Sequence, residues 1–366
     1  MKHRYSGEVN MTGRIDRIDD RLQSLPKPPL KRIDDISIGS RDVLILAAGF
    51  EDRATGILER LVSANCSGFT TIIIDYRPKY KENKIHKIEE LCHRLNTRIV
   101  HFLYDRHDPG GAGEQLIEQL DQHNIEGRIF LDISAMSRLF IVQALVAIGK
   151  SRRGFSNIEI LYCEAQSYPP DEEEVKETIS EMKDDSIYRT MFISSGVYEV
   201  TIVTELSSIA LQGQPIRLVA FPSFNTDQLA SLRGETQPSH FSFLHGIPPL
   251  VENAWRPEAI KELNHLEKIR NRKDLEASTL NYQETLDCLL EIYRNYGDIE
   301  RIVIAPTGSK MQTVAVGIFR TFMNDVQVVY PTPKEFPSPQ SYTIGVKNIY
   351  RLPLDAFNGL IKKPDD

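Results

Sequence analysis

Residues 128–149 read RIFLDISAMSRLFIVQALVAIG, and residues 301–319 read RIVIAPTGSKMQTVAVGIF. Each stretch begins with a short apolar run, passes through a turn of small and polar residues, and ends in an apolar segment long enough for a helix. A short apolar run of this kind is typical of a strand that is covered on both faces, as in a parallel sheet. The two stretches therefore predict one strand–turn–helix unit that occurs twice in the chain.

Two further pairs of segments support a duplication. NIEILYCEAQSYPP at 157–170 parallels DVQVVYPTPKEFPSP at 325–339, and a looser third pair begins at Ser195 and at Ile344. The three pairs occur in the same order along the chain, which chance similarity rarely preserves. The natural consequence is two similar halves related by a pseudo-two-fold axis, as with isologous contacts in a homodimer.

Apolar runs alternate with amphipathic stretches from residue 42 to residue 162, and again from residue 216 to residue 330. This βαβαβαβαβ order is typical of a doubly wound sheet with right-handed crossovers. The sequence therefore predicts an α/β fold with two tandem, mainly parallel Rossmann-like domains. The predicted first domain spans residues 41–210, with a solvated acidic insertion at about 171–186, and the second domain spans 211–366. Residues 1–40 are predicted to form an N-terminal arm that packs loosely, awaits a partner or is disordered.

The composition excludes several classes of protein. With 41% hydrophobic and 26% charged residues, the 366-residue chain has ordinary globular values. Its formal net charge of −7 argues against a general electrostatic hold on a nucleic-acid backbone but permits a local basic pocket. Four widely spaced cysteines without a CxxC motif argue against a disulfide framework or a zinc site and favour the cytoplasm. Because no apolar run approaches 18 residues, we expect no membrane span.

The turns that follow the first and fourth strands of each half are rich in small, hydroxyl-bearing or charged residues: 49–53, 134–138, 222–227 and 306–310. In open parallel sheets, ligands bind beyond the carboxyl ends of the strands. A small-residue turn that opens a helix presents backbone N–H groups and the positive end of the helix dipole. A neighbouring hydroxyl and a basic side chain would complete a phosphate site. The alternative is that Ser or Thr in these turns simply caps a helix.

PTGSKMQTVAVGIF at 306–319 resembles the TGGTK segment of CRISPR-associated Rossmann-fold (CARF) domains, and LDISAMSRLFIVQA at 131–144 resembles it more distantly. The resemblance implies binding of cyclic oligoadenylates or related signal nucleotides and control of an effector. Because we find no room for an effector domain beside the two halves, it also implies a separate partner protein. By this resemblance the phosphate or ribose groups would be held by Ser134, Ser137, Arg138, Thr307, Gly308, Ser309 and Lys310.

The loop Gly49-Phe-Glu-Asp-Arg53 contains two acids that the corresponding turn of the second half, Phe221-Pro-Ser-Phe-Asn225, lacks. As a ligand-binding loop, Gly49 would allow close approach, Glu51 or Asp52 would accept hydrogen bonds, and Arg53 would reach a phosphate. As part of an active site, Glu51, Asp52 or the nearby Asp132 would act as a general base or metal ligand. As a structural feature, the two acids would stabilise a helix N-terminus.

These observations favour a nucleotide-sensing or regulatory subunit. The CARF resemblance further implies a role in bacterial antiviral defence, in which the subunit acts through an effector or another defence protein. Two alternatives remain open: a phosphodiesterase of the ring-nuclease kind that hydrolyses a nucleotide, and an assembly subunit without catalysis. We expect no resident cofactor or metal, and the chain could form a homo-oligomer. Convergence of the four turns on one basic cleft would favour a ligand, whereas separated turns would favour assembly.

Overall fold

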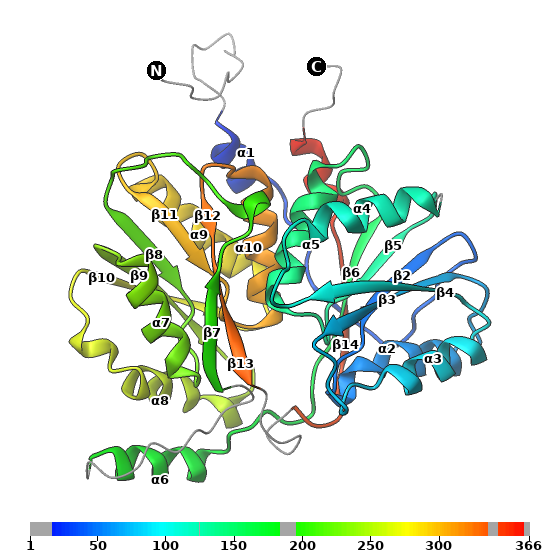
Figure 1. Cartoon of the computed structure of the whole chain (residues 1–366), viewed down its shortest axis with the longest axis horizontal. Coiled ribbons are helices and arrows are strands. Elements are labelled where there is room, and N and C mark those ends of the chain that lie inside the picture. Colours follow the sequence, from blue (N-terminus) through cyan, green and yellow to red (C-terminus); the bar gives the residue numbers. More distant parts are fainter. Residues whose placement is uncertain (1–16, 124, 184–194, 336–342, 362–366) are drawn as a thin grey trace.

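The computed structural model describes residues 17–123, 125–183, 195–335 and 343–361, and it places two largely parallel sheets side by side (Figure 1). In the first half, five parallel strands have the order β4-β3-β2-β5-β6. The apolar runs of the four inner strands are largely buried because helices cover both faces, whereas the edge strand β4 is buried only at Phe102 and Tyr104. The bounds are Val43–Ala47 for β2, Thr70–Arg77 for β3, Arg98–Asp105 for β4, Ile129–Asp132 for β5 and Ile158–Cys163 for β6.

The second half repeats this arrangement. Its five parallel strands have the order β10-β9-β8-β11-β12, which is the same order counted from the first strand of the half. The predicted α/β class is therefore confirmed, with one doubly wound sheet in each half; the pseudo-two-fold relation stays a prediction. The bounds are Ile216–Ala220 for β8, His240–Ile247 for β9, Arg272–Ser278 for β10, Arg301–Ala305 for β11 and Gln327–Val328 for β12.

One helix joins each pair of successive parallel strands. Among these helices, α7 was not predicted, because Leu229 and Leu232 are its only buried apolar residues and its amphipathic pattern is weak. The helices of the first half are α2 (Gly56–Ser63), α3 (Ile85–Arg94), α4 (Ala112–Gln122) and α5 (Arg138–Lys150), and those of the second are α7 (Thr226–Thr236), α8 (Arg256–Leu263), α9 (Tyr282–Tyr296) and α10 (Lys310–Phe322).

Each half donates a strand to the other half. Strand β7 (Ser195–Thr201) follows the first half in sequence but pairs with β13 (Tyr330–Glu335), which continues from the second. Strand β14 (Ile349–Pro353), near the C-terminal end, pairs with β6 of the first half. The predicted domain limits of 41–210 and 211–366 therefore differ from the structure at these strands. The exchange ties the halves together through backbone hydrogen bonds.

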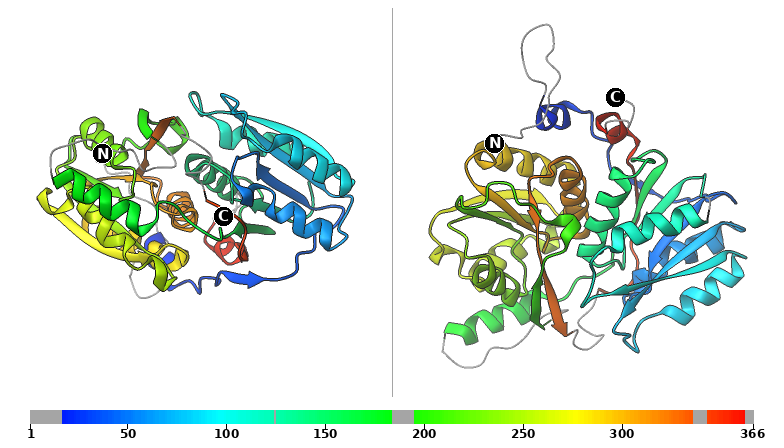
Figure 2. Two further views of the ribbon diagram at one scale, coloured as in Figure 1. Left: turned by 90° about the horizontal axis from the view of Figure 1, so that it is seen from below. Right: turned by 45° about the horizontal axis from the view of Figure 1, so that its top comes forward.

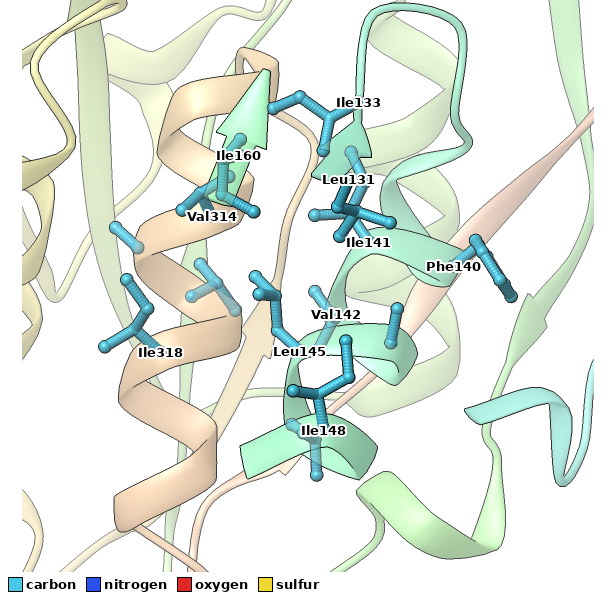
Figure 3. Packing of buried hydrophobic residues seen from close by; sticks show 14 of the residues in the cluster. Leu131, Ile133, Phe140, Ile141, Val142, Leu145, Ile148, Ile160, Val314 and Ile318 are labelled. Atoms are coloured by element: carbon cyan, nitrogen blue, oxygen red, sulfur yellow. The ribbon is translucent and has the colours of Figure 1, made fainter. Parts of the chain in front are cut away.

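Helices α5 and α10 occupy equivalent places in the two halves and pack against each other at the centre of the molecule (Figures 1 and 3). Leu145 of α5 lies beside Gly317 of α10, so close that a Cβ atom at Gly317 would lie 2.6 Å from a Leu145 methyl group. Val314 and Ile318 belong to the same buried cluster. The largest of the buried hydrophobic clusters therefore spans both halves.

The N-terminal arm differs from the prediction. Helix α1 (Ile18–Ser24) packs against α9, where Arg294 forms ion pairs with Asp19 and Asp20. Strand β1 (Lys31–Ile33) then joins the first sheet beside β14. In the left view of Figure 2, the segment that holds β1 runs from one half to the other. Residues 17–40 are thus an integral strap; residues 1–16 lie outside the described part.

The predicted acidic insertion contains helix α6 (Glu172–Lys183), with an exposed acidic side and an apolar contact to α8. Val175 is buried together with Leu263 of α8. The solvated insertion is therefore partly anchored; its residues 184–186 lie outside the described part. Among the described helices, none has both the length and the apolar character that a membrane crossing requires.

Replacing Leu22 by alanine is expected to lower the free energy of unfolding by about 2 kcal/mol, because Leu22 of α1 is completely buried in the shared core. Urea denaturation measures the loss. The matched control is Leu103→Ala, since 56% of Leu103 is exposed and its truncation should cost less than about 0.5 kcal/mol. Equal effects of both variants would show that the arm does not contribute to the fold.

Candidate ligand-binding site

The four turns of the two halves converge on one cavity of about 300 Å³. Gly49 comes from the turn after β2, Ser137 from the turn after β5, Asn225 from the turn after β8, and Thr307 from the turn after β11. Because the carboxyl ends of parallel strands meet at one sheet edge, each half brings two of these turns together. The packing of α5 on α10 then places the two pairs face to face.

Helices α5 and α10 begin at this cavity, where Arg138 and Lys310 are their first residues. The hydroxyl of Ser137 caps α5 by accepting a hydrogen bond from the Phe140 N–H at 3.2 Å. In α10, Ser309 and Gln312 form a reciprocal capping box. The N–H groups of a first helical turn have no acceptor within the helix, and the helix dipole makes this end positive. Two such ends therefore meet at the cavity.

The two equivalent basic residues each reach across to the opposite half. The guanidinium of Arg138 donates to the backbone carbonyl of Gly308, and the ammonium of Lys310 donates to the backbone carbonyl of Met136. Met136 and Gly308 themselves occupy equivalent places, two residues before Arg138 and Lys310. This reciprocal pair of contacts is the geometry expected where duplicated turns face each other. It places two cationic groups together at the junction of the halves.

Lys310 is held in an unfavourable electrostatic environment. Burial, together with the positive charges of Arg53 and Arg138, lowers the pKa of Lys310 to about 7, although Glu51 acts in the opposite direction. A neutral carbonyl compensates a buried ammonium only weakly compared with an anionic acceptor. The site is therefore one in which a bound anion would be strongly stabilised.

Arg53 and Glu51 form a largely buried ion pair with an N–O distance of 2.5 Å at the wall of the cavity. Burial opposes ionisation of Glu51, but the charges of Arg53 and Lys310 outweigh it and lower the pKa of this carboxyl. Arg53 also donates to the Tyr162 hydroxyl at 3.3 Å. The positive charge of Arg53 is thus largely balanced by contacts within the protein.

Positive charge dominates the cavity lining in the described part of the chain. Among the described residues that line the cavity, Glu51 is the only one with a carboxylate. Two of the lining cations, Arg106 and Arg256, were not predicted from the sequence. Two features of the sequence could have indicated them: Arg106 directly follows the parallel strand β4, and Arg256 is the first residue of α8. The lining cations are Arg53, Arg106, Arg138, Arg256 and Lys310.

Three tyrosine side chains were also missed as lining residues. The Arg106 guanidinium lies over the ring of Tyr76 with its carbon 4.4 Å from the ring centroid. The Tyr76 hydroxyl accepts a hydrogen bond of 2.6 Å from the Ser137 N–H, so this ring is fixed beside the start of α5. Tyr104 and Tyr330 line the same cavity. A single tyrosine at a strand end carries no recognisable motif, which is why the sequence did not reveal them.

Several predicted ligand-binding residues have structural contacts instead. Ser134 is completely buried; its hydroxyl donates to the Asp132 carboxylate and accepts from the Cys163 N–H at 2.8 Å. The Ser309 hydroxyl caps α10 and donates to the Thr279 carbonyl. A side chain at Gly308 would collide with Gln312 of the capping box. These three residues are outside the cavity lining, whereas Gly49, Arg53, Ser137, Arg138, Thr307 and Lys310 are within it.

The structure places only one of the three candidate acids at the cavity. Glu51 lines the cavity, but Asp132 and Asp52 do not. Burial raises the pKa of Asp132 to about 6, although Ser134 donates hydrogen bonds to it. Asp52 is half exposed, and its ion pair with Lys84 lowers its pKa. Within the described residues, no three His, Cys, Asp or Glu side chains are grouped as metal ligands.

Replacing Ser134 by alanine is expected to lower the free energy of unfolding by about 1–2 kcal/mol. The change removes the hydroxyl that donates to the buried Asp132 carboxylate, which keeps the hydrogen bond from the backbone N–H of residue 134, and it leaves the Cys163 N–H without its acceptor. Chemical denaturation measures the effect, with Ser63→Ala as the control because the exposed Ser63 hydroxyl bonds only to a carbonyl of its own helix. A variant as stable as the control would contradict the structural role.

No family model matches the chain, and no curated protein matches it. Among solved structures, the cytoplasmic domain of a prokaryotic cation chloride cotransporter is 10% identical over 81% of this chain and 97% of its own, with a TM-score of 0.23. A functionally unknown protein from Pseudomonas aeruginosa PAO1 is 9% identical over 86% and 95%, also with a TM-score of 0.23. Likenesses at this level carry no functional information.

Proposed function

We propose that this protein binds a phosphate-containing nucleotide at the junction of its two halves and acts as a regulatory subunit. The observation that carries the proposal is the meeting of two helix N-termini, with Arg138 and Lys310, at one cavity. Helix N-termini and basic side chains are the groups that bind phosphate in many α/β proteins. The same convergence disfavours the assembly-only alternative, which predicted separated turns.

A bound phosphate would offer both cations a better partner than they have now. Arg138 and Lys310 donate to neutral carbonyls, whereas phosphate oxygens carry charge and can accept from both groups together. A phosphate here would also raise the pKa of Lys310 from about 7, so binding near neutral pH would take up a proton. Phosphate is therefore the anionic group that we assign to the ligand.

The remaining lining fits the nucleoside part of such a ligand. The rings of Tyr76, Tyr104 and Tyr330 provide aromatic surface, and Thr307 and Thr332 bring hydroxyl groups to the wall. Base stacking on aromatic rings is a common way to hold a nucleobase. A pocket that is cationic at one place and aromatic at others suits a nucleotide better than inorganic phosphate.

Regulation is favoured over turnover. Of the three acids considered for catalysis, only Glu51 lines the cavity, and it is already paired with Arg53. A general base needs access to a substrate proton, which Asp132 and Asp52 lack at these positions. The role in bacterial antiviral defence and the effector partner rest on the resemblance to CARF domains and remain predictions.

Calorimetric titration of the full chain tests the proposal with 5′-mononucleotides, cyclic mononucleotides and cyclic oligoadenylates as probes. We expect at least one probe to bind, and Arg138→Met combined with Lys310→Met to weaken that binding about 100-fold or more. Each lost contact to a charged acceptor is worth about 1.5–3 kcal/mol. The bound probe should be recovered unchanged.

The control for this experiment is Lys81→Met, which removes a positive charge from an exposed loop outside the cavity. Its affinity should equal that of the unmodified protein. The proposal would fail if no probe binds, or if the double variant binds as tightly as the control. Hydrolysis of the probe that depends on Glu51 would instead establish the enzymatic alternative.

A further inference from the structure

The size of the cavity limits what it can hold. At about 300 Å³ it lies at the small end of the roughly 300–1,000 Å³ found for pockets that enclose small-molecule ligands. A cyclic tetranucleotide carries four times the nucleotide units of a mononucleotide. Only a ligand near the smaller size can be enclosed here unless the walls move apart.

One wall of the cavity, here called its floor, resists such a movement of the walls. It is formed where α5 and α10 begin, and these two helices are packed against each other along their lengths (Figure 3). Gly317 allows Leu145 to approach the backbone of α10, and Gly149 does the same for Thr321 at the far end of the contact. Separating the halves would expose this shared core to water, which burial of apolar surface opposes.

The rim of the cavity is also tied across the two halves. Arg256 of α8 donates to the Tyr168 carbonyl at 2.8 Å and to the Pro169 carbonyl at 3.1 Å, both in the segment that follows the first-half strand β6. Widening the opening would break these contacts as well.

The charge at the floor matches one phosphate group. Arg138 and Lys310 stand together there, while the charge of Arg53 is balanced by Glu51. A cyclic oligonucleotide distributes its phosphates around a ring and would need several such pairs. Among the described lining cations, Arg138 and Lys310 are the pair that meets where the corresponding turns face each other. Arg106 lies over the Tyr76 ring, and Arg256 donates to backbone carbonyls of residues 168–170.

We propose that the ligand is a single nucleotide, with one phosphate between Arg138 and Lys310 and one nucleoside beside the tyrosine rings, and not a cyclic oligoadenylate. This inference rests on the proposed function and restricts it to one class of nucleotide. It also separates this protein from the expectation that the CARF resemblance raised. The halves act as one preformed receptor for a small ligand.

A competition between ligand classes tests the inference on the full chain at pH 7. One class contains the 5′-monophosphates and the 2′,3′- and 3′,5′-cyclic monophosphates of the four bases; the other contains cyclic tri-, tetra- and hexa-adenylate. We expect a mononucleotide to bind with 1:1 stoichiometry and at least tenfold more tightly than any cyclic oligoadenylate. Its affinity should fall about 100-fold in the Arg138→Met, Lys310→Met double variant and stay unchanged in Lys81→Met.

Each other result is decisive. Tighter binding of a cyclic oligoadenylate that the double variant abolishes would overturn this inference and leave the proposed function standing. Failure of both classes to bind would overturn both. A mononucleotide that binds equally well to the double variant occupies another place on the protein, which would also overturn both.

Discussion

Replacing Gly317 by leucine is expected to lower the free energy of unfolding by about 3 kcal/mol. A Cβ atom at this position would lie 2.6 Å from one methyl carbon of Leu145 and 3.0 Å from its Cβ atom. Leu145 is completely buried within the cluster that spans both halves. Overpacking a well-filled core typically costs about 1–3 kcal/mol, and leucine adds four carbon atoms at the point where the two halves meet.

Urea denaturation measures this loss, and Gly234→Leu is the matched control. Gly234 also lies within a helix, α7, but it is exposed, and a Cβ atom added there would have no other heavy atom within 4 Å. Because glycine weakens a helix by about 1 kcal/mol relative to good helix formers, the control should be neutral or slightly stabilised. A Gly317→Leu variant that is as stable as this control would refute a rigid contact between α5 and α10.

Replacing Lys310 by methionine is expected to change how stability depends on pH. The pKa of Lys310 is lowered from 10.5 to about 7 in the folded protein, chiefly by burial. Between these values the unfolded chain binds more protons at this residue than the folded chain does, so the free energy of unfolding rises with pH. At pH 7 the folded state still bears most of the cost of a buried charge, and methionine removes that cost.

The expected difference is large enough to measure. Each pKa unit corresponds to about 1.4 kcal/mol, so between pH 7 and pH 9 the unmodified protein should gain about 2 kcal/mol more stability than Lys310→Met. Denaturation at both pH values, with Lys81→Met as the control, gives this comparison. If stability changes with pH in the same way in the unmodified protein and in Lys310→Met, the pKa of Lys310 is not lowered by folding.

Together with the expected loss of ligand binding, a Lys310→Met protein that is more stable at pH 7 would identify Lys310 as a residue kept for binding. Functional sites commonly hold groups that lower stability in the absence of their ligand. The contrast with Leu145 and Gly317 is informative, because those residues pack between the halves and are outside the cavity lining.

The local pattern predicted most strands and helices, since an apolar run or a helical repeat is visible within one element. It missed α7, which has two buried apolar side chains and a glycine near its end. The pattern could not reveal that β7 and β14 exchange between halves, because a strand's partner depends on the path of the whole chain. It also could not show that residues 17–40 form a strap.

For the candidate site, too, the sequence predicted some features correctly and others only the structure could show. Repetition of a turn before a helix predicted Ser137, Arg138, Thr307 and Lys310 at the cavity, and the structure places them there. Repetition also predicted Ser134, whose side chain turns inward to Asp132 because that carboxylate and the Cys163 N–H need partners. Sequence alone does not say toward which side a serine hydroxyl turns.

The amino-acid sequence by itself determined the α/β class, the twofold repetition of its strand–turn–helix units and the polar character of the turns, because these follow from side-chain periodicity within short segments. Only the tertiary structure decided that four turns share one cavity, that Arg106 and Arg256 join it, and that Arg138 and Lys310 cross between the halves. The physical reason is that these features depend on the packing of α5 against α10, which joins residues far apart in the chain.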